Sequence, residues 1–175
     1  MGVDKATLMV GDVPLWRRQR DLLRAAGADE VLLSARPEQA WAMAADGFQA
    51  VLHDRFADCG PIGGVCAGLE RMTGTHLAVV AVDLPQLPSA WLQRLVRGSS
   101  AGSGCVGVRG DVFEPLAVVY PREAKSFVWE RLARGDYSLQ SLLRAAVEQG
   151  LMMPVPIARA EEPWFANWNA PADLR

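Results

Sequence analysis

The fold is decided by the stretch Thr75-His-Leu-Ala-Val-Val-Ala-Val-Asp-Leu-Pro-Gln-Leu-Pro88. Six apolar residues, 77–82, follow one another without a polar break, which is typical of a short strand buried on both faces of a parallel sheet. The strand has to stop at Asp83, because Pro85 and Pro88 cannot donate to a central β-ladder. The carboxylate is therefore delivered to the C-terminal edge of the sheet, where open α/β sheets bind their ligands.

Two interpretations of Asp83 stay open from the spacing alone. A lone acid at this edge suits a hard cation such as Mg²⁺ that is shared with substrate phosphates. The same carboxylate could instead cap the helix expected at 91–97, or close the turn that leads to it.

The alternation of strands and helices around this stretch gives the fold class. It predicts a doubly wound α/β fold with a mostly parallel sheet. Residues 101–120 break the alternation and predict a small antiparallel extension, a hairpin turned at Gly110-Asp111. Strands are expected at 8–10, 31–33, 48–52, 77–82, 105–108, 113–120 and 152–157, and helices at 14–26, 37–45, 61–72, 89–96, 123–133 and 138–148.

Length and composition narrow the class of protein. A chain of 175 residues favours one domain, spanning 1–175. The net charge of −2 argues against a general nucleic-acid binder, and no apolar run approaches the ~20 residues of a membrane span. Cys59, Cys66 and Cys105 form no C-x-x-C pair, which argues against zinc and a disulfide framework. We therefore expect a cytoplasmic protein whose partners include neither nucleic acid nor a membrane.

Two further features are expected at the same edge of the sheet. Asp54 ends the strand at 48–52, and adjacent parallel strands place their C-terminal ends together. As a strand-end aspartate it could equally be a turn former. The turn at 58–64 precedes a helix, so its glycines, including Gly60, would let an anionic ligand approach the backbone. The turn is neither G-x-G-x-x-G nor a Walker loop.

The two ends of the chain supply the remaining candidates. Lysine is rare here, with Lys5 and Lys125 the only two, and Lys5 lies in the glycine-containing start of the chain. Asn167 and Asn169 alternate in an extended tail, so their amides point the same way. Each amide could bind a ligand, or the pair could form a turn into a terminal helix.

Motifs spread over nearly the whole chain carry a resemblance to a known family. In their order and separations they resemble the motifs of the molybdenum cofactor guanylyltransferases and their nucleotidyltransferase cousins. The motifs are Met1-Gly-Val-Asp-Lys-Ala, Gly11-Asp-Val-Pro-Leu15, Gly60-Pro-Ile-Gly-Gly-Val-Cys-Ala-Gly-Leu69, Ala81-Val-Asp-Leu-Pro-Gln-Leu-Pro88, Glu114-Pro-Leu and Phe165-Ala-Asn-Trp-Asn-Ala-Pro-Ala-Asp-Leu174.

The resemblance implies an activity and roles for four of the candidates. Such enzymes move GMP from GTP onto the terminal phosphate of molybdopterin and release pyrophosphate. On this basis Asp83 would hold Mg²⁺ against the nucleotide phosphates, and Lys5 would offset negative charge on the phosphoryl group. Asp54 would contact the guanosine, and Gly60 would lie at the nucleotide.

The acceptor side of the reaction is implied in the same way. Asn167 and Asn169 would line the pterin side of the site. The expected partners are GTP, molybdopterin and, beyond them, molybdoenzymes or their chaperones.

Two departures from the family pattern keep alternatives open. Ser34 stands where the family often has asparagine near the base, so a cytidylyltransferase acting on the same pterin is an alternative. The family also begins with an apolar strand and a loop, L-A-G-G-x-S-x-R, ahead of the methionine-glycine. At roughly 1.5–3 kcal/mol for each buried side chain, losing three or four would cost on the order of 5–12 kcal/mol. We therefore expect an N-terminally incomplete domain, and a non-catalytic relative that binds molybdopterin or a partner enzyme is the second alternative.

Overall fold

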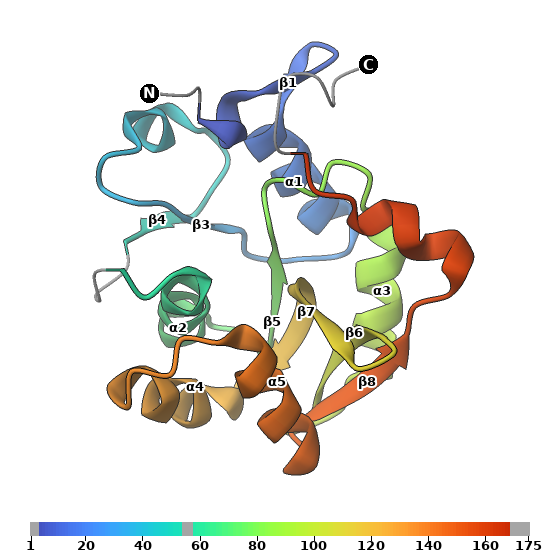
Figure 1. Ribbon diagram of the computed structural model, residues 1–175. Helices are drawn as coiled ribbons and strands as arrows, with labels where there is room; N and C mark the ends of the chain where they lie inside the picture. The colour runs from blue at the N-terminus through green and yellow to red at the C-terminus, as the bar shows by residue number, and fades with distance from the viewer. Residues whose placement is uncertain (1–3, 54–57, 169–175) are drawn as a thin grey trace.

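The computed structural model describes residues 4–53 and 58–168, and a four-stranded sheet lies at its centre (Figure 1). In spatial order its strands are β5 (His76–Val80), β7 (Val112–Pro121), β6 (Gly104–Arg109) and β8 (Met152–Pro156). Strand β7 is antiparallel to both of its neighbours, whereas β8 is parallel to β6. Three of the four strands therefore run in one direction. A separate parallel pair is formed by β3 (Leu32–Ser34) and β4 (Ala50–Leu52).

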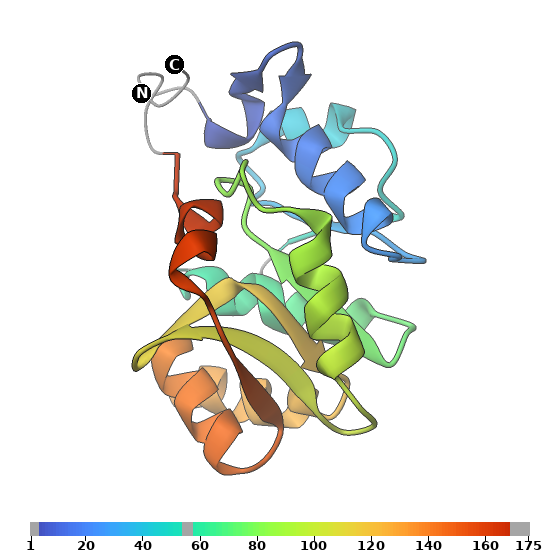
Figure 2. The ribbon, with the colours of Figure 1, turned by 90° about the vertical axis from the view of Figure 1, so that its right-hand side faces the viewer.

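Helices cover both faces of the sheet (Figure 2). One face carries α2 (Pro61–Arg71), α4 (Ala124–Ala133) and α5 (Leu139–Glu148), and the other carries α3 (Ser89–Gly98), against which α1 (Leu15–Ala25) packs. Successive side chains of β7 alternate between the two sides: Val118 faces the first group of helices, and Ala117 and Val119 face α3. This arrangement confirms the predicted doubly wound α/β fold with a mostly parallel sheet, and β7 is the strand that runs antiparallel to its neighbours. No helix in the described ranges is both long and apolar enough to cross a membrane.

Short elements complete the chain around these layers. They are η1 (Lys5–Thr7), the hairpin of β1 (Met9–Val10) and β2 (Val13–Pro14), η2 (Ala40–Ala44) and η3 (Arg159–Phe165). The predicted antiparallel hairpin is confirmed by β6 and β7, which turn at Gly110-Asp111. The helix expected at 37–45 is present in a shorter form, as the 3-10 helix η2 over Ala40–Ala44.

Strand β5 is less buried than its apolar run predicted. All five of its residues are only half-buried, whereas a central strand would be covered on both faces. The reason is that β5 pairs on one side only, with β7, while β3 belongs to the other pair of strands. The strand still ends before Asp83, so the predicted position of that carboxylate beyond the sheet is confirmed.

Candidate functional site

The candidate site is built around a cation and an acid that lie 78 residues apart in the chain. The Nζ atom of Lys5 is 3.4 Å from Oδ2 of Asp83. Lys5 opens η1 and Asp83 follows β5, so the amino-terminal turn meets the end of the sheet here. The two side chains are 44% and 20% exposed, and a pair this accessible adds only ~0–1 kcal/mol of stability. The pair therefore contributes little to stability, and what matters is the position of its two charges at the end of the sheet.

Asp4 fixes the turn that carries Lys5. Its Oδ1 accepts a hydrogen bond from the backbone N–H of Ala6 (3.0 Å), and its Oδ2 accepts from Gln39 Nε2 (2.7 Å) and Trp41 Nε1 (2.9 Å). Burial alone would raise the pKa of Asp4, but these hydrogen bonds outweigh burial and hold the pKa below its ordinary value. Asp4 is not among the candidates that the sequence indicates. Its N-cap position before Lys5 was a local signal, but its partners lie 35 and 37 residues away.

The loop that carries Asp83 is held by other parts of the chain through its backbone carbonyls. The three bonds run from Arg18 Nε to Pro85 O (2.7 Å), from Gln19 Nε2 to Leu84 O (2.7 Å) and from Trp168 N to Asp83 O (3.0 Å). Helix α1 and the tail therefore fix the loop from two sides. This gives the acid a defined position although it lies outside regular secondary structure.

The tail passes beside this loop, which places one of the two predicted pterin ligands near the acid. Asn167 is exposed and directly precedes Trp168, whose N–H bonds the carbonyl of Asp83. Asn169 lies outside the described residues. The structure therefore brings Asn167 to the neighbourhood of Asp83 and says nothing of its companion.

The start of α2 shows how a glycine-rich turn can present its backbone. Gly60 is the N-cap of α2 and has φ +67°, a conformation that side-chain-bearing residues rarely adopt. Among residues 4–53 and 58–168, a Cβ atom at this position would meet nothing within 4 Å, so these parts of the chain leave the backbone open to a ligand. Pro61 and Gly64 line the same cavity as Asp4 and Val82, the residue before Asp83. Asp54 lies outside the described residues.

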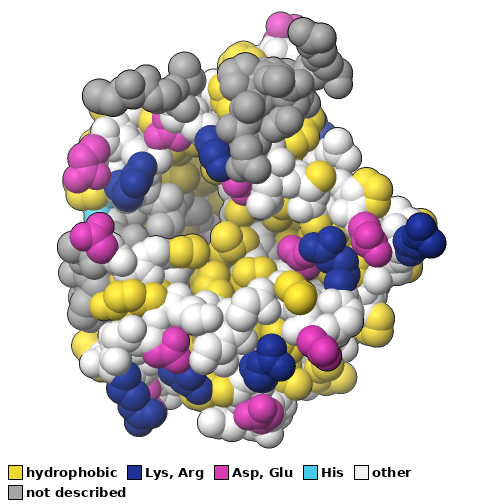
Figure 3. Space-filling view, in the orientation of Figure 1, with side chains coloured by type: hydrophobic (Ala, Val, Ile, Leu, Met, Phe, Trp, Pro, Cys, Tyr) yellow, Lys and Arg dark blue, Asp and Glu magenta, His cyan; other side chains and the backbone are white. Residues whose placement is uncertain are grey.

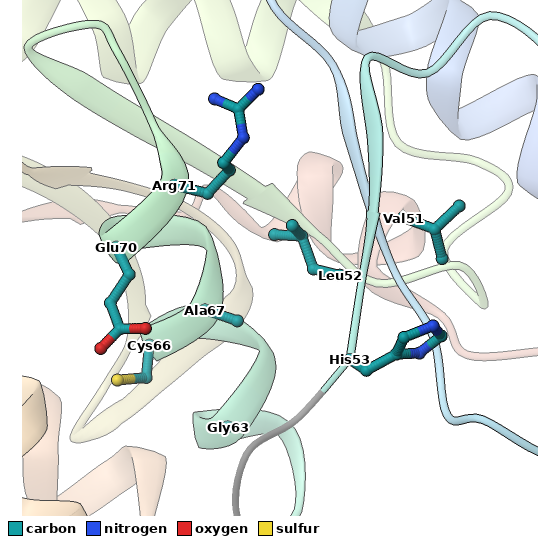
Figure 4. A pocket seen from close by; sticks show the side chains of 8 residues that line it. All are labelled: Val51, Leu52, His53, Gly63, Cys66, Ala67, Glu70 and Arg71. Carbon is teal, nitrogen blue, oxygen red and sulfur yellow. The ribbon is translucent and has the colours of Figure 1, made fainter.

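A second cavity, of about 320 Å³, lies between β4 and α2 (Figure 4). The side chains of His53, Glu70 and Arg71 point apart in this cavity and have partners outside it. His53 Nδ1 lies 2.8 Å from the carbonyl of Ala35, Glu70 accepts from Trp129 Nε1, and Arg71 pairs with Glu30. These three side chains therefore do not converge on the cavity.

The side chains around Asp83 determine which kind of metal ion this place could hold. No group of three or more His, Cys, Asp or Glu side chains within residues 4–53 and 58–168 is placed to hold a metal ion. Asp83 nevertheless offers a hard, partly exposed carboxylate at the edge of the sheet. Mg²⁺ is typically held by one or two carboxylates together with substrate phosphates and water. The carboxylate therefore fits a metal ion that arrives with a phosphate ligand.

Comparisons with known proteins agree on one family. A family model described as the MobA-like NTP transferase domain matches residues 1–150. A protein of Opitutus terrae named "Probable molybdenum cofactor guanylyltransferase" is 38% identical over 99% of this chain and 86% of its own length.

Solved structures share the fold over most of the chain. The molybdopterin-guanine dinucleotide biosynthesis protein A of Archaeoglobus fulgidus matches 99% of this chain and 88% of its own, with a TM-score of 0.76 and 22% identity. A protein of Mycobacterium tuberculosis solved as a complex with manganese matches 90% of this chain and 84% of its own, with a TM-score of 0.59 and 18% identity.

Proposed function

Because the chain belongs to the family of molybdenum cofactor guanylyltransferases and is therefore a nucleotidyltransferase, we propose that it transfers GMP from GTP to molybdopterin. An oxygen of the terminal phosphate of molybdopterin attacks the α-phosphorus of GTP. The bond from that phosphorus to the bridging oxygen of the β-phosphate breaks, and pyrophosphate leaves with the electron pair. The attacking oxygen is already anionic, so the reaction needs no strong general base. Molybdoenzymes or their chaperones would receive the product.

The observation that carries the proposal is the approach of Lys5 to Asp83 at the end of β5. Asp83 would hold Mg²⁺, which supplies a positive charge against the phosphate oxygens of the nucleotide. Lys5, 3.4 Å from this carboxylate, would offset the negative charge that develops on the transferred phosphoryl group. Phosphoryl-type transfer depends mostly on positioning and charge neutralisation, and these two side chains provide both.

The remaining candidates would bind the two substrates on either side of this centre. The open backbone at Gly60 and the start of α2 suits an anion and would approach the phosphates. Asp54 would contact the guanosine. Asn167 and Asn169 would bind the pterin, a role supported by the tail's hydrogen bond to the Asp83 loop.

The test is pyrophosphate release from GTP, molybdopterin and Mg²⁺ by the purified chain and two variants. Asp83→Asn should lower kcat/KM by on the order of 10²–10³ if this carboxylate holds the metal against the phosphates. Asp111→Asn, an exposed carboxylate in the β6–β7 turn, is the matched control and should keep the parent activity. Equal turnover by the parent and Asp83→Asn would refute the assignment of the metal site.

Cytidylyl transfer to the same pterin is the competing function, and Ser34 is the reason to test it. Ser34 lines the same cavity as Asp4, close to the candidate site, and replaces the asparagine that the family often has there. The assay with CTP in place of GTP decides between them. A higher kcat/KM with CTP would change the proposed donor and leave the roles of Lys5 and Asp83 as they are.

A further inference from the structure

A charge pair that has no part in the proposed reaction joins the 3-10 helix η3 to α3. Both Nη atoms of Arg94 donate to the carboxylate of Glu161, Nη1 to Oε1 at 2.8 Å and Nη2 to Oε2 at 3.0 Å. Arg94 lies on α3 and Glu161 on η3, 67 residues apart in the chain. Figure 3 shows acidic and basic side chains close together on the side of the molecule where these two elements lie. Such a bidentate pair fixes the orientation of both side chains.

An aromatic contact joins the same two elements. Trp91, one turn before Arg94 on α3, packs edge-on against Phe165 at the end of η3, with ring centroids 5.0 Å apart at an angle of 86°. The indole N–H of Trp91 donates to the carbonyl of Ala117 in β7 (3.0 Å), so the sheet fixes the ring. The guanidinium carbon of Arg94 lies 4.3 Å from the centre of the same ring. Trp91 therefore contacts Arg94 and Phe165 together.

Glu161 is also held by its own end of η3. Its side chain is 15% exposed, and its Oε2 accepts a second hydrogen bond, from the backbone N–H of Ala158 (3.0 Å). The hydrogen bonds from Arg94 hold the pKa of Glu161 below its ordinary value, although burial alone would raise that pKa. The carboxylate is therefore charged at neutral pH. Arg94 is 38% exposed, so solvent screens the pair, and its loss should leave the fold intact.

The segment that these contacts fix leads directly to the candidate site. Phe165 is buried, and three residues later the N–H of Trp168 donates to the carbonyl of Asp83 (3.0 Å). Asn167 lies exposed between these two anchored residues. The position of Asn167 beside the Asp83 loop therefore depends on how firmly η3 is held.

The Asp83 loop is anchored in the same place as the tail. It continues directly into α3, and its Leu84 and Leu87 are buried in one apolar cluster with Trp91 and Phe165. Helix α3 therefore carries the loop of the candidate site at its start and holds the tail by its side. It fixes the two relative to each other.

We propose that Arg94 is a positioning residue for the acceptor substrate: through Glu161 it holds η3 so that Asn167 is presented to molybdopterin beside Asp83. Arg94 would act through η3 and would not itself contact a substrate. The inference rests on the proposed guanylyl transfer, in which the tail binds the pterin, and it adds a residue that lies outside the motifs of the sequence.

Loss of the Arg94–Glu161 pair should weaken binding of the acceptor and spare the donor. The tail is proposed to bind the pterin, whereas GTP is proposed to lie at Asp83, Lys5 and the start of α2. A contact that is equally strong in the ground state and in the transition state affects KM and leaves kcat unchanged. A merely structural role would instead lower the fraction of active protein, so that kcat falls while both KM values stay the same.

The direct test is the dissociation constant of molybdopterin for the full chain, measured by calorimetry without GTP. Arg94→Met keeps the apolar stem beside Trp91 and removes the two donors. We expect the dissociation constant to rise about tenfold, as for the loss of hydrogen bonds to a charged group. Arg97→Met, an exposed arginine later in α3, is the matched control and should keep the parent value. Unchanged affinity of Arg94→Met, or an equal change in Arg97→Met, would overturn the proposal.

Steady-state kinetics separate positioning from a structural role. In both Arg94→Met and Glu161→Gln we expect the KM for molybdopterin to rise about tenfold, with kcat and the KM for GTP within about twofold of the parent. A fall in kcat with both KM values unchanged, or an equal rise in the two KM values, would contradict the proposal.

Amide hydrogen exchange measured by NMR follows the tail without any substrate. Exchange at the N–H of Trp168 should become about tenfold faster in Arg94→Met, while protection in β6 and β7 stays as in the parent. Unchanged exchange at Trp168 would overturn the proposal, and loss of protection in β6 and β7 would show a general loss of structure instead.

The two proposals fail in different ways. If the parent binds molybdopterin but releases no pyrophosphate from GTP, the proposed transfer is refuted, and the calorimetric comparison still decides the role of Arg94. If the parent is active and Arg94→Met binds molybdopterin as tightly, only the role of Arg94 is refuted. A parent that does not bind molybdopterin would overturn both.

Discussion

Replacing Asp4 tests whether the turn that carries Lys5 is held as the structure shows. Asp4→Ala removes two side-chain hydrogen bonds, from Gln39 and Trp41, and the N-cap of η1. At about 1 kcal/mol for each bond and about 1 kcal/mol for the cap, the free energy of unfolding should fall by ~3 kcal/mol. Asp4→Asn keeps one acceptor oxygen and should lose about half as much.

Asp4 should also make the free energy of unfolding depend on pH, with a loss of stability on the acid side. The pKa of Asp4 is lowered from 3.8 in the folded protein, so its stabilising contribution is complete above this value. The contribution is lost as the pH falls through the folded pKa. Asp4→Asn should therefore flatten the acid side of the stability profile below about pH 4. Urea unfolding at several pH values between 3 and 7 measures both effects.

An exposed aspartate in the turn between β1 and β2 provides the control. Asp12→Ala should change the free energy of unfolding by no more than about 0.5 kcal/mol. The reasoning fails if Asp4→Ala is as mild as Asp12→Ala, or if Asp4→Asn retains the acid dependence of the parent. Either result would mean that Gln39 and Trp41 do not hold this carboxylate in solution.

Two further substitutions test the site and the core. Lys5→Ala should lower kcat by about 10²-fold with less change in KM, because the charge of Lys5 is proposed to act on the transition state. Lys125→Ala, at an exposed position of α4, is the control and should leave kcat unchanged. Equal effects of the two substitutions would remove Lys5 from the mechanism. Gly107→Ala should cost about 1–3 kcal/mol in thermal or urea unfolding, since the new Cβ would lie 2.6 Å from the ring of Trp91. Gly74→Ala, whose Cβ has only a carbonyl at 3.8 Å, is the matched control, and a similar cost for both would contradict the packing described for Trp91.

The layers of the fold could be predicted because they follow from local patterns. The apolar run before Asp83, the helix started by Pro61 and the turn at Gly110-Asp111 each depend on nearby residues, and the structure has all three. The burial of β5 could not be predicted in this way, because it depends on which strands pair with it. An apolar run specifies a strand without specifying its neighbours.

The candidate site was predictable only in part, for a related reason. Asp83 ends a strand and is visible from the sequence, whereas Asp4 acquires its role from Gln39 and Trp41 across a distance in the chain. Gln39 and Trp41 lie at the start of the 3-10 helix that stands in the place of the longer helix expected at 37–45. The expectation of a single domain over residues 1–175 stays a prediction.

The hydrogen bond from Trp168 to the carbonyl of Asp83 has a consequence for how the protein is made. A ribosome adds roughly 5–20 residues per second and releases the chain from its amino end. The loop that holds Asp83 emerges early, but this bond waits for a residue synthesised long afterwards. A nascent chain therefore cannot form this hydrogen bond of the candidate site until Trp168 has been added, and chains truncated before Trp168 should hold the Asp83 loop less firmly.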